Sequence, residues 1–249
     1  MVGNRVYGLA AVLLGAVVLA WHDFSAVWQP VPDALPQRAL FAYAAGAILV
    51  AAGIALVARR WERPAALAVA ALSLVFAAGW VGRIAGQPAQ FAMWLGLAEQ
   101  MAVVLGGLAV VASSKPRAGP VAHTLRVAFG LCLLAFGTAH LLYVKETAEM
   151  VPAWLPPGQR FWALATGVAD LAGGIALLAG PFALLAARLA TAMFIGFGVL
   201  VWLPRLLAAP SEQMNWFGNA INLTIAAGAW AVADLIARVP PSAWWRRGR

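Results

Sequence analysis

The chain has 249 residues, of which 63% are hydrophobic and 10% are charged, and its mean hydropathy is +0.84. Soluble domains carry about a quarter charged residues, so this composition excludes an ordinary soluble protein and indicates an integral membrane protein. The formal net charge of +8 does not indicate nucleic-acid binding, because the basic residues are spread over short loops and one tail, which suits an anionic membrane surface.

Eight apolar segments are long enough to cross a hydrocarbon core about 30 Å thick as helices. They lie at about residues 4–28, 37–57, 65–85, 90–111, 121–144, 157–179, 181–206 and 213–238. The first is longer than an ordinary signal-peptide core and has no clear cleavage site, so we retain it as a membrane helix. Residues 113–120, rich in Ser, Pro and Gly, predict a linker, and residues 239–249 predict an interfacial or disordered tail.

Cysteine and tryptophan usage gives two further expectations. Cys132 is the single cysteine and lies inside an apolar segment, which predicts a buried small side chain and excludes a disulfide framework. Several of the twelve tryptophans lie near segment ends, where indole rings prefer the headgroup zone. These are Trp21, Trp28, Trp80, Trp94, Trp154, Trp216, Trp244 and Trp245.

An internal duplication relates the two halves of the chain. Residues 21–53 and 140–174 share the order His, Pro-x-x-x-Pro, small-residue helix. At an offset of 122 residues, Trp80-x-x-Arg83 matches Trp202-x-x-Arg205 and Trp94-x-Gly96 matches Trp216-x-Gly218; at an offset of 121, Gly46 and Gly53 match Gly167 and Gly174. We expect these glycines to be points of close helix packing.

Each repeat has an even number of spans, so both enter the membrane in the same direction. The sequence therefore predicts an all-α polytopic membrane protein whose eight transmembrane helices form two parallel four-helix bundles. These are residues 1–112 and residues 121–238, related by a pseudo-twofold axis along the membrane normal.

The distribution of basic residues predicts the orientation of the helices. One predicted side carries twelve Lys and Arg residues and the other carries five. The positive-inside rule then places both termini in the cytoplasm, in a bacterial cytoplasmic (inner) membrane. The two histidines of the duplication, His22 and His140, and both Trp-x-x-Arg motifs are then expected to face the outer side.

Polar residues inside the spans predict a cluster in the outer half of each bundle, because ionisable groups in a membrane usually face an interior or a cavity. The favoured set is His140, Asp170 and Arg205. Further candidate ligand-binding residues are His22, Arg83, Glu99, Gln100, Trp202, Asn219 and Asn222. Leu49 stands at the position equivalent to Asp170, and Ile221 at that of Glu99, so the duplicated sites have diverged.

Several interpretations of these residues stay open. Arg83 and Arg205 either extend to lipid headgroups or pair with Glu99 and Asp170, and Asp170 could simply tie helices together. Two histidines at equivalent positions also permit a haem held between them, although a single pair is weak evidence. A zinc or copper site at His22 lacks a Cys or a second nearby His to complete it, so no metal is predicted.

Three segments of the second half resemble a known family. They are Phe136-Gly137-Thr138-Ala139-His140, Met150 to Pro156 (MVPAWLP) and Thr166 to Gly174 (TGVADLAGG). In order and spacing they are similar to the DoxX family of small four-helix membrane proteins, closely over residues 121–231 and more weakly over the first half. The family more often has a glutamate at the position of Asp170 and is commonly a single unit. The resemblance implies a link to quinone-dependent oxidation.

The first functional hypothesis is a membrane redox accessory protein with an outward-facing pocket for a quinone-like or other lipophilic ligand. His140 would hydrogen-bond or protonate a carbonyl oxygen, Asp170 would shuttle a proton, and Arg205 would stabilise the reduced anion. A periplasmic or membrane redox partner would supply the electrons. The alternatives are a non-catalytic scaffold for a periplasmic partner, and a haem-binding or small-solute transport protein.

Overall fold

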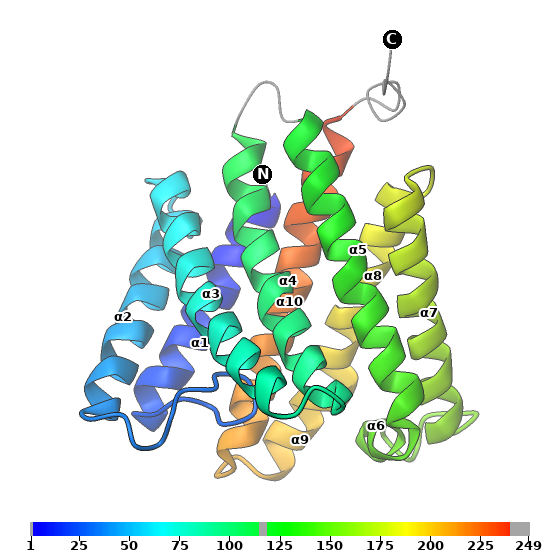
Figure 1. The fold of residues 1–249 in the computed structure, drawn as a ribbon, viewed down its shortest axis with the longest axis horizontal. Helices are drawn as coiled ribbons and strands as arrows, with labels where there is room; N and C mark the ends of the chain where they lie inside the picture. The colour runs from blue at the N-terminus through cyan, green and yellow to red at the C-terminus, as the bar shows by residue number, and fades with distance from the viewer. Residues whose placement is uncertain (1, 115–118, 240–249) are drawn as a thin grey trace.

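The computed structural model describes residues 2–114 and 119–239, and over these residues the fold is all-helical (Figure 1). The elements are α1 (Val2–Trp21), α2 (Arg38–Val57), α3 (Glu62–Gly86), α4 (Phe91–Ser113), α5 (Gly119–Leu142), α6 (Val144–Met150), α7 (Gln159–Ala179), α8 (Ala183–Phe197), the π-helical η1 (Gly198–Trp202), α9 (Leu203–Ala208) and α10 (Gln213–Ala237). Within the described residues eight helices are long and apolar enough to cross a membrane, with α8, η1 and α9 forming one of them. The prediction of a multi-pass helical membrane protein is confirmed.

One predicted helix boundary is wrong, and two other spans differ from the prediction in detail. The first helix ends at Trp21 rather than near residue 28, because His22 adopts a left-handed backbone with φ of 53°. The fifth ends at Leu142 and is followed by the short α6. The seventh span contains the π-helical turn η1. The core of the predicted linker, residues 115–118, and the tail from residue 240 on, with Trp244 and Trp245, lie outside the described residues.

Glycines let two pairs of helices approach each other closely. A Cβ added at Gly53 of α2 would lie 2.5 Å from the carbonyl oxygen of Gly8 in α1. A Cβ at Gly137 of α5 would lie 2.6 Å from that of Gly167 in α7. Such distances leave no room for a side chain, so glycine is required at both contacts. Helices in lipid associate through close packing of this kind, because burial of apolar surface gives no advantage over contact with lipid tails.

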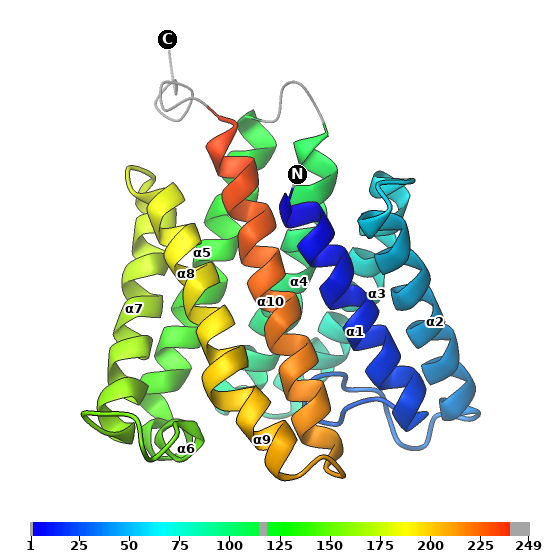
Figure 2. The same ribbon diagram turned by 180° about the vertical axis from the view of Figure 1, so that it is seen from behind.

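The centre of the molecule is the contact between α4 and α10, which lie side by side in both views (Figures 1 and 2). A Cβ at Gly106 of α4 would lie 2.5 Å from the Cα atom of Gly228 in α10. Each central helix also packs against the first helix of the other half, α1 against α10 and α5 against α4. The two halves of the chain are therefore in extensive contact.

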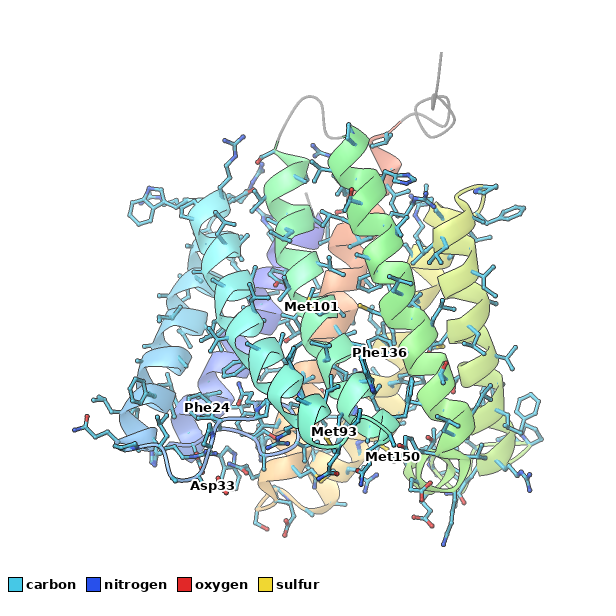
Figure 3. All side chains as sticks on the ribbon, in the orientation of Figure 1. Phe24, Asp33, Met93, Met101, Phe136 and Met150 are labelled. Carbon is cyan, nitrogen blue, oxygen red and sulfur yellow. The ribbon has the colours of Figure 1, made fainter. Side chains whose placement is uncertain are left out.

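The two ends of the described chain and its two long connections lie at opposite ends of the molecule. The beginning of α1 and the end of α10 lie at one end, at the top of Figure 1. The loop after α1, the short helix α6 and α9 lie at the other end. The side chains of the outer helices cover the faces that would meet lipid (Figure 3).

The connections that follow α1 and α5 fold differently, although they occupy equivalent places in the two halves. The first connection turns inward: Phe24 is 4% exposed and packs edge-on against Phe76 of α3, and Gln29 is fully buried. Asp23 anchors it through an ion pair with Arg38, whose Nε lies 2.5 Å from Oδ1. The second connection forms α6 instead, and none of the α6 residues is buried. The first connection therefore fills the space between the helices of its half, whereas the second connection leaves the equivalent space open.

We expect Gly137→Ala to destabilise the protein by about 1–3 kcal/mol, because the added methyl group would force α5 and α7 apart. Gly82→Ala is the matched control, since a Cβ at Gly82 in α3 meets nothing within 4 Å. That change should raise stability by up to about 1 kcal/mol through helix propensity. Thermal unfolding of both variants in detergent measures the difference, and equal midpoints would contradict the close-packing role of Gly137.

Candidate functional site

A cavity of about 560 Å³ lies between the helices of the second half, with part of its wall supplied by the first half. Its apolar lining comes largely from α5, α6, α8 and η1, including Phe136 and Met150, which Figure 3 labels. From the first half, Trp28 and two residues of α4, Leu95 and Glu99, complete the wall. The cavity is large enough for a small organic molecule and lies toward the end of the molecule that carries α6.

Asp170 is the most unusual polar group of the cavity wall. It lies near the middle of α7 and is 1% exposed, and neither of its carboxyl oxygens has a hydrogen-bond partner in the structure. Buried polar groups in proteins are nearly always hydrogen-bonded, so an unsatisfied carboxyl on a cavity wall calls for an explanation. The equivalent residue of the first half, Leu49, is also buried at 1% exposure, and it has no polar group to satisfy.

His140 lies in the last turn of α5 on the same cavity wall. Its Nδ1 is 3.0 Å from the hydroxyl oxygen of Thr166, one turn before Asp170 in α7. The Thr166 hydroxyl donates to the carbonyl oxygen of Trp162 at 2.7 Å, so we assign the proton between His140 and Thr166 to Nδ1. The other face of the imidazole lies near Phe197, with ring centroids 6.0 Å apart. The neutral ring then presents Nε2 as a hydrogen-bond acceptor.

Glu99 reaches the cavity from the first half of the chain. Its Oε1 lies 3.4 Å from Nε1 of Trp28, which donates to it. The neighbouring Gln100 does not line the cavity; it is 1% exposed and donates from Nε2 to the carbonyl oxygen of Trp28 at 2.8 Å. These two bonds hold Trp28 against the cavity, where its indole meets that of Trp202 edge-on with centroids 5.7 Å apart. The first connection thus closes one side of a cavity that belongs mainly to the second half.

The π-helical turn η1 shapes the opposite wall. It ends at Trp202, which is 8% exposed and lines the cavity. Gly218 of α10 lies directly against this indole, since a Cβ at Gly218 would be 2.0 Å from a ring carbon of Trp202. Asn222, one turn further along α10, donates from Nδ2 to the carbonyl oxygen of Phe194 at 2.9 Å. Single π-helical turns are frequent at functional sites, because they change the direction of the side chains that follow.

The remaining predicted site residues lie outside the cavity. Arg205 of α9 is exposed, and His22 is exposed beside Tyr43, with ring centroids 5.1 Å apart. Arg83 is exposed, donates to the carbonyl oxygen of Ala26 at 3.1 Å and places its guanidinium 4.9 Å from the ring centroid of Trp80. Asn219 is half-buried but is not a lining residue.

The predicted pairings of Arg205 with Asp170 and of Arg83 with Glu99 do not form among the described residues. Both arginines lie at the ends of spans and are exposed, whereas the two carboxyl groups lie on the wall of the cavity. Arg83 instead contacts Trp80 and the first connection.

Sequence reasoning missed several residues that line the cavity. Trp28 was expected only as a ring near the headgroup zone, and it is 6% exposed and lines the cavity. Thr166, which holds His140, and Glu146 of α6 were not selected as site residues. The spacing of Thr166 and Asp170, one helical turn apart, was the available signal, because it places both on one face of α7.

No group of three or more His, Cys, Asp and Glu side chains that could hold a metal ion occurs among residues 2–114 and 119–239. The two histidines do not share the cavity, since His22 contacts α2 and His140 contacts α7. What the cavity offers is a set of hydrogen-bonding groups in an apolar enclosure. Such an arrangement can orient a lipophilic molecule through a polar head.

Comparison with known proteins gives one match. Residues 129–233 match a family model described as "Domain of unknown function (DUF8561)". The range includes His140, Asp170 and Trp202, and it excludes Glu99 and Trp28. No curated protein and no solved structure matches the chain. The matched part is less than half of the chain, and it coincides with the helices that form most of the cavity wall.

We expect Gln100→Leu to loosen the first connection, because the backbone of Trp28 loses the hydrogen bond from Nε2, a contribution of about 1 kcal/mol. Hydrogen–deuterium exchange of residues 23–36 should become faster. Gln159→Leu is the matched control: Gln159 donates from Nε2 to the carbonyl oxygen of Val151 at 2.6 Å in the second connection. That variant should accelerate exchange in residues 151–158 only, and unchanged exchange in residues 23–36 of Gln100→Leu would contradict the anchoring role.

Proposed function

We propose that this chain is a membrane protein that binds a lipophilic molecule with a polar head in the cavity between its helices. The observation that carries the proposal is Asp170. An unpartnered carboxyl within a membrane span is destabilising by a few kcal/mol on insertion scales, and such groups usually mark a functional site. A ligand that donates a hydrogen bond to Asp170 supplies the partner that the protein lacks.

The alternative of a structural role for Asp170 has less support. A carboxyl group that ties helices together needs a donor on a neighbouring helix, and both oxygens of Asp170 are without one. The equivalent position in the first half is occupied by Leu49, packed between helices that approach through the same glycine contacts. The helix pair therefore does not require a carboxyl at this position.

The resemblance to the DoxX family supports a quinone-like ligand and a role as a redox accessory protein. In that form of the proposal His140 and Asp170 contact the oxygens of the ring, and a membrane or periplasmic partner supplies the electrons. Arg205 has no part in it, because its exposed side chain is outside the cavity. Without Arg205, the cavity has no cation to stabilise the anionic reduced form of a quinone. The geometry therefore supports ligand binding better than a redox step.

The two halves are proposed to be DoxX-like units related by a pseudo-twofold axis along the membrane normal. The contact of Gly106 with Gly228 supports this, because the two glycines are separated by the repeat offset of 122 residues. Equivalent residues meet each other only at a symmetry axis. The glycine contacts of α1 with α2 recur at the same offsets in α5 and α7, which adds independent support.

The proposed location is the bacterial cytoplasmic membrane, with both termini in the cytoplasm. The loop between α2 and α3 contributes Arg59 and Arg60, and the first turn of α3 contributes Arg63; this loop lies at the same end of the molecule as the beginning of α1 (Figure 1). Basic loops are retained on the cytoplasmic side. The cavity and α6 would then lie toward the outer side.

Ligand retention tests the proposed function. The protein is purified in native lipid patches, and its organic extract is compared by mass spectrometry with that of Asp170→Leu. We expect a compound that is retained by the natural protein and depleted in the variant, while Arg205→Gln retains it. Asp170→Leu should also gain about 1–3 kcal/mol of stability, because the change removes an unsatisfied buried polar group. Identical extracts from the natural protein and Asp170→Leu would refute the proposal.

Cysteine labelling tests the orientation. Cys132 is buried and is first replaced by alanine, which leaves a chain without cysteine. In this background Glu149→Cys on α6 should react with an impermeant maleimide added to intact cells. Arg60→Cys should react only after the membrane is opened. The reverse pattern would place the termini outside.

A further inference from the structure

We propose that the head of the ligand is a cation, and specifically that the cavity binds a lipophilic amine whose ammonium group lies at Asp170. This inference rests on the proposed function, since it names the class of molecule that the same cavity takes. Three independent features of the wall support it: its charges, the direction of its hydrogen bonds, and its aromatic rings.

The charges on the wall are all of one sign. The whole chain has nine acidic residues against seventeen Lys and Arg residues, yet Asp170, Glu99 and Glu146 all line the cavity. None of the described lining residues is Lys or Arg. When its carboxyl groups are ionised, a cavity with this lining attracts a positive head and repels an anion. The wall is therefore opposite in sign to the protein as a whole.

Four hydrogen-bond donors of the wall are engaged within the protein. The indole of Trp28 donates to Glu99, and that of Trp162 donates to the carbonyl oxygen of Pro156 at 2.9 Å. The hydroxyl of Thr166 and the amide of Asn222 donate to main-chain carbonyls of their own surroundings. An acceptor-only head would find these four donors already engaged.

Some carboxyl oxygens of the wall, unlike these donors, lack hydrogen-bond partners. Both carboxyl oxygens of Asp170 are without a donor, and the long contact of 3.4 Å from Trp28 leaves the second oxygen of Glu99 for another partner. A protonated amine carries up to three N–H donors and a positive charge, which suit unpartnered carboxylate oxygens. A quinone carbonyl, which only accepts, offers no donor to these oxygens when the carboxyl groups are ionised.

Aromatic rings surround the same space. Phe136 and Phe194 contact each other edge-on with centroids 5.9 Å apart, and Phe194 and Phe197 follow at 6.0 Å. Trp202 and Trp162 add two indoles to the lining. The faces of such rings attract an ammonium group, and their hydrocarbon accommodates an apolar body. Glu146, exposed on α6, adds a carboxyl group to the lining.

The test compares two fluorescent probes of nearly the same shape. Aminomethylpyrene is a lipophilic amine that is protonated at neutral pH, and pyrenemethanol is its neutral alcohol, which keeps one O–H donor. Each is titrated into the protein in nanodiscs of zwitterionic lipid, with energy transfer from tryptophan to pyrene as the readout. Empty nanodiscs correct for partition into the lipid.

We expect the amine to bind at least about tenfold more tightly than the alcohol, because hydrogen bonds to charged groups are about that much stronger. Asp170→Asn should weaken binding of the amine about ten- to a hundredfold and leave binding of the alcohol nearly unchanged. Glu99→Gln should weaken binding of the amine less, since Trp28 already donates to Glu99. Arg205→Gln, outside the cavity, is the control and should alter neither affinity.

The outcomes separate this inference from the proposed function. Equal affinities for amine and alcohol, both reduced by Asp170→Leu, would overturn the charge selectivity and leave ligand binding in place. Binding of neither probe above empty nanodiscs, combined with identical extracts from the natural protein and Asp170→Leu, would overturn both. Unchanged amine affinity in both Asp170→Asn and Glu99→Gln would refute the assignment of the carboxyl groups, and unaltered thermal unfolding shows that the variants are folded.

Discussion

The architecture depends on the close approach of helix backbones at glycine. Within a membrane the burial of apolar side chains does not drive helices together, so the fit between their surfaces determines which pairs form. Glycines set three of these contacts: α1 with α2, α5 with α7, and α4 with α10 at the centre. These contacts fix the depth of α5 against α7, and therefore place His140 beside Thr166 and one turn from Asp170.

The cavity results from a difference between two connections rather than from a difference between helices. Phe24 and Gln29 fill the end of the first half, and Asp23 holds their loop to α2. The second connection forms the short helix α6, none of whose residues is buried and which lines the cavity instead of filling it. The same first connection also places Trp28 against the cavity of the second half, so one loop both fills its own half and closes the other.

The membrane class and the eight spans could be predicted because lipid requires every backbone group to be paired within a helix, which apolar length alone reveals. His140 and Asp170 could be assigned to one site from their positions within the predicted membrane spans. The position of Arg205 outside the cavity could not be foreseen from the sequence. Arg205 follows a π-helical turn, and the hydrogen bonds of such a turn leave no signature in composition. The contribution of Glu99 was equally hidden, since it depends on how α4 of one half meets α5 of the other. His22 and His140 show the same limit: they occupy equivalent places in sequence, yet a left-handed backbone at His22 ends α1 and exposes the ring, whereas α5 continues past His140.

If the two halves are the symmetric units proposed above, the contact of Gly106 with Gly228 bears on why they are joined in one chain. If two identical chains met at this contact, every substitution would appear on both sides of the axis, and position 49 could not be leucine while position 170 is aspartate. The dimer would then carry either two cavities with a buried aspartate or none. A tandem gene product escapes this coupling, so one half can specialise as a rigid support while the other becomes the receptacle. The destabilising effect of a buried aspartate then arises only once, at Asp170. The first half, with Leu49 at the equivalent position, can stabilise the second half.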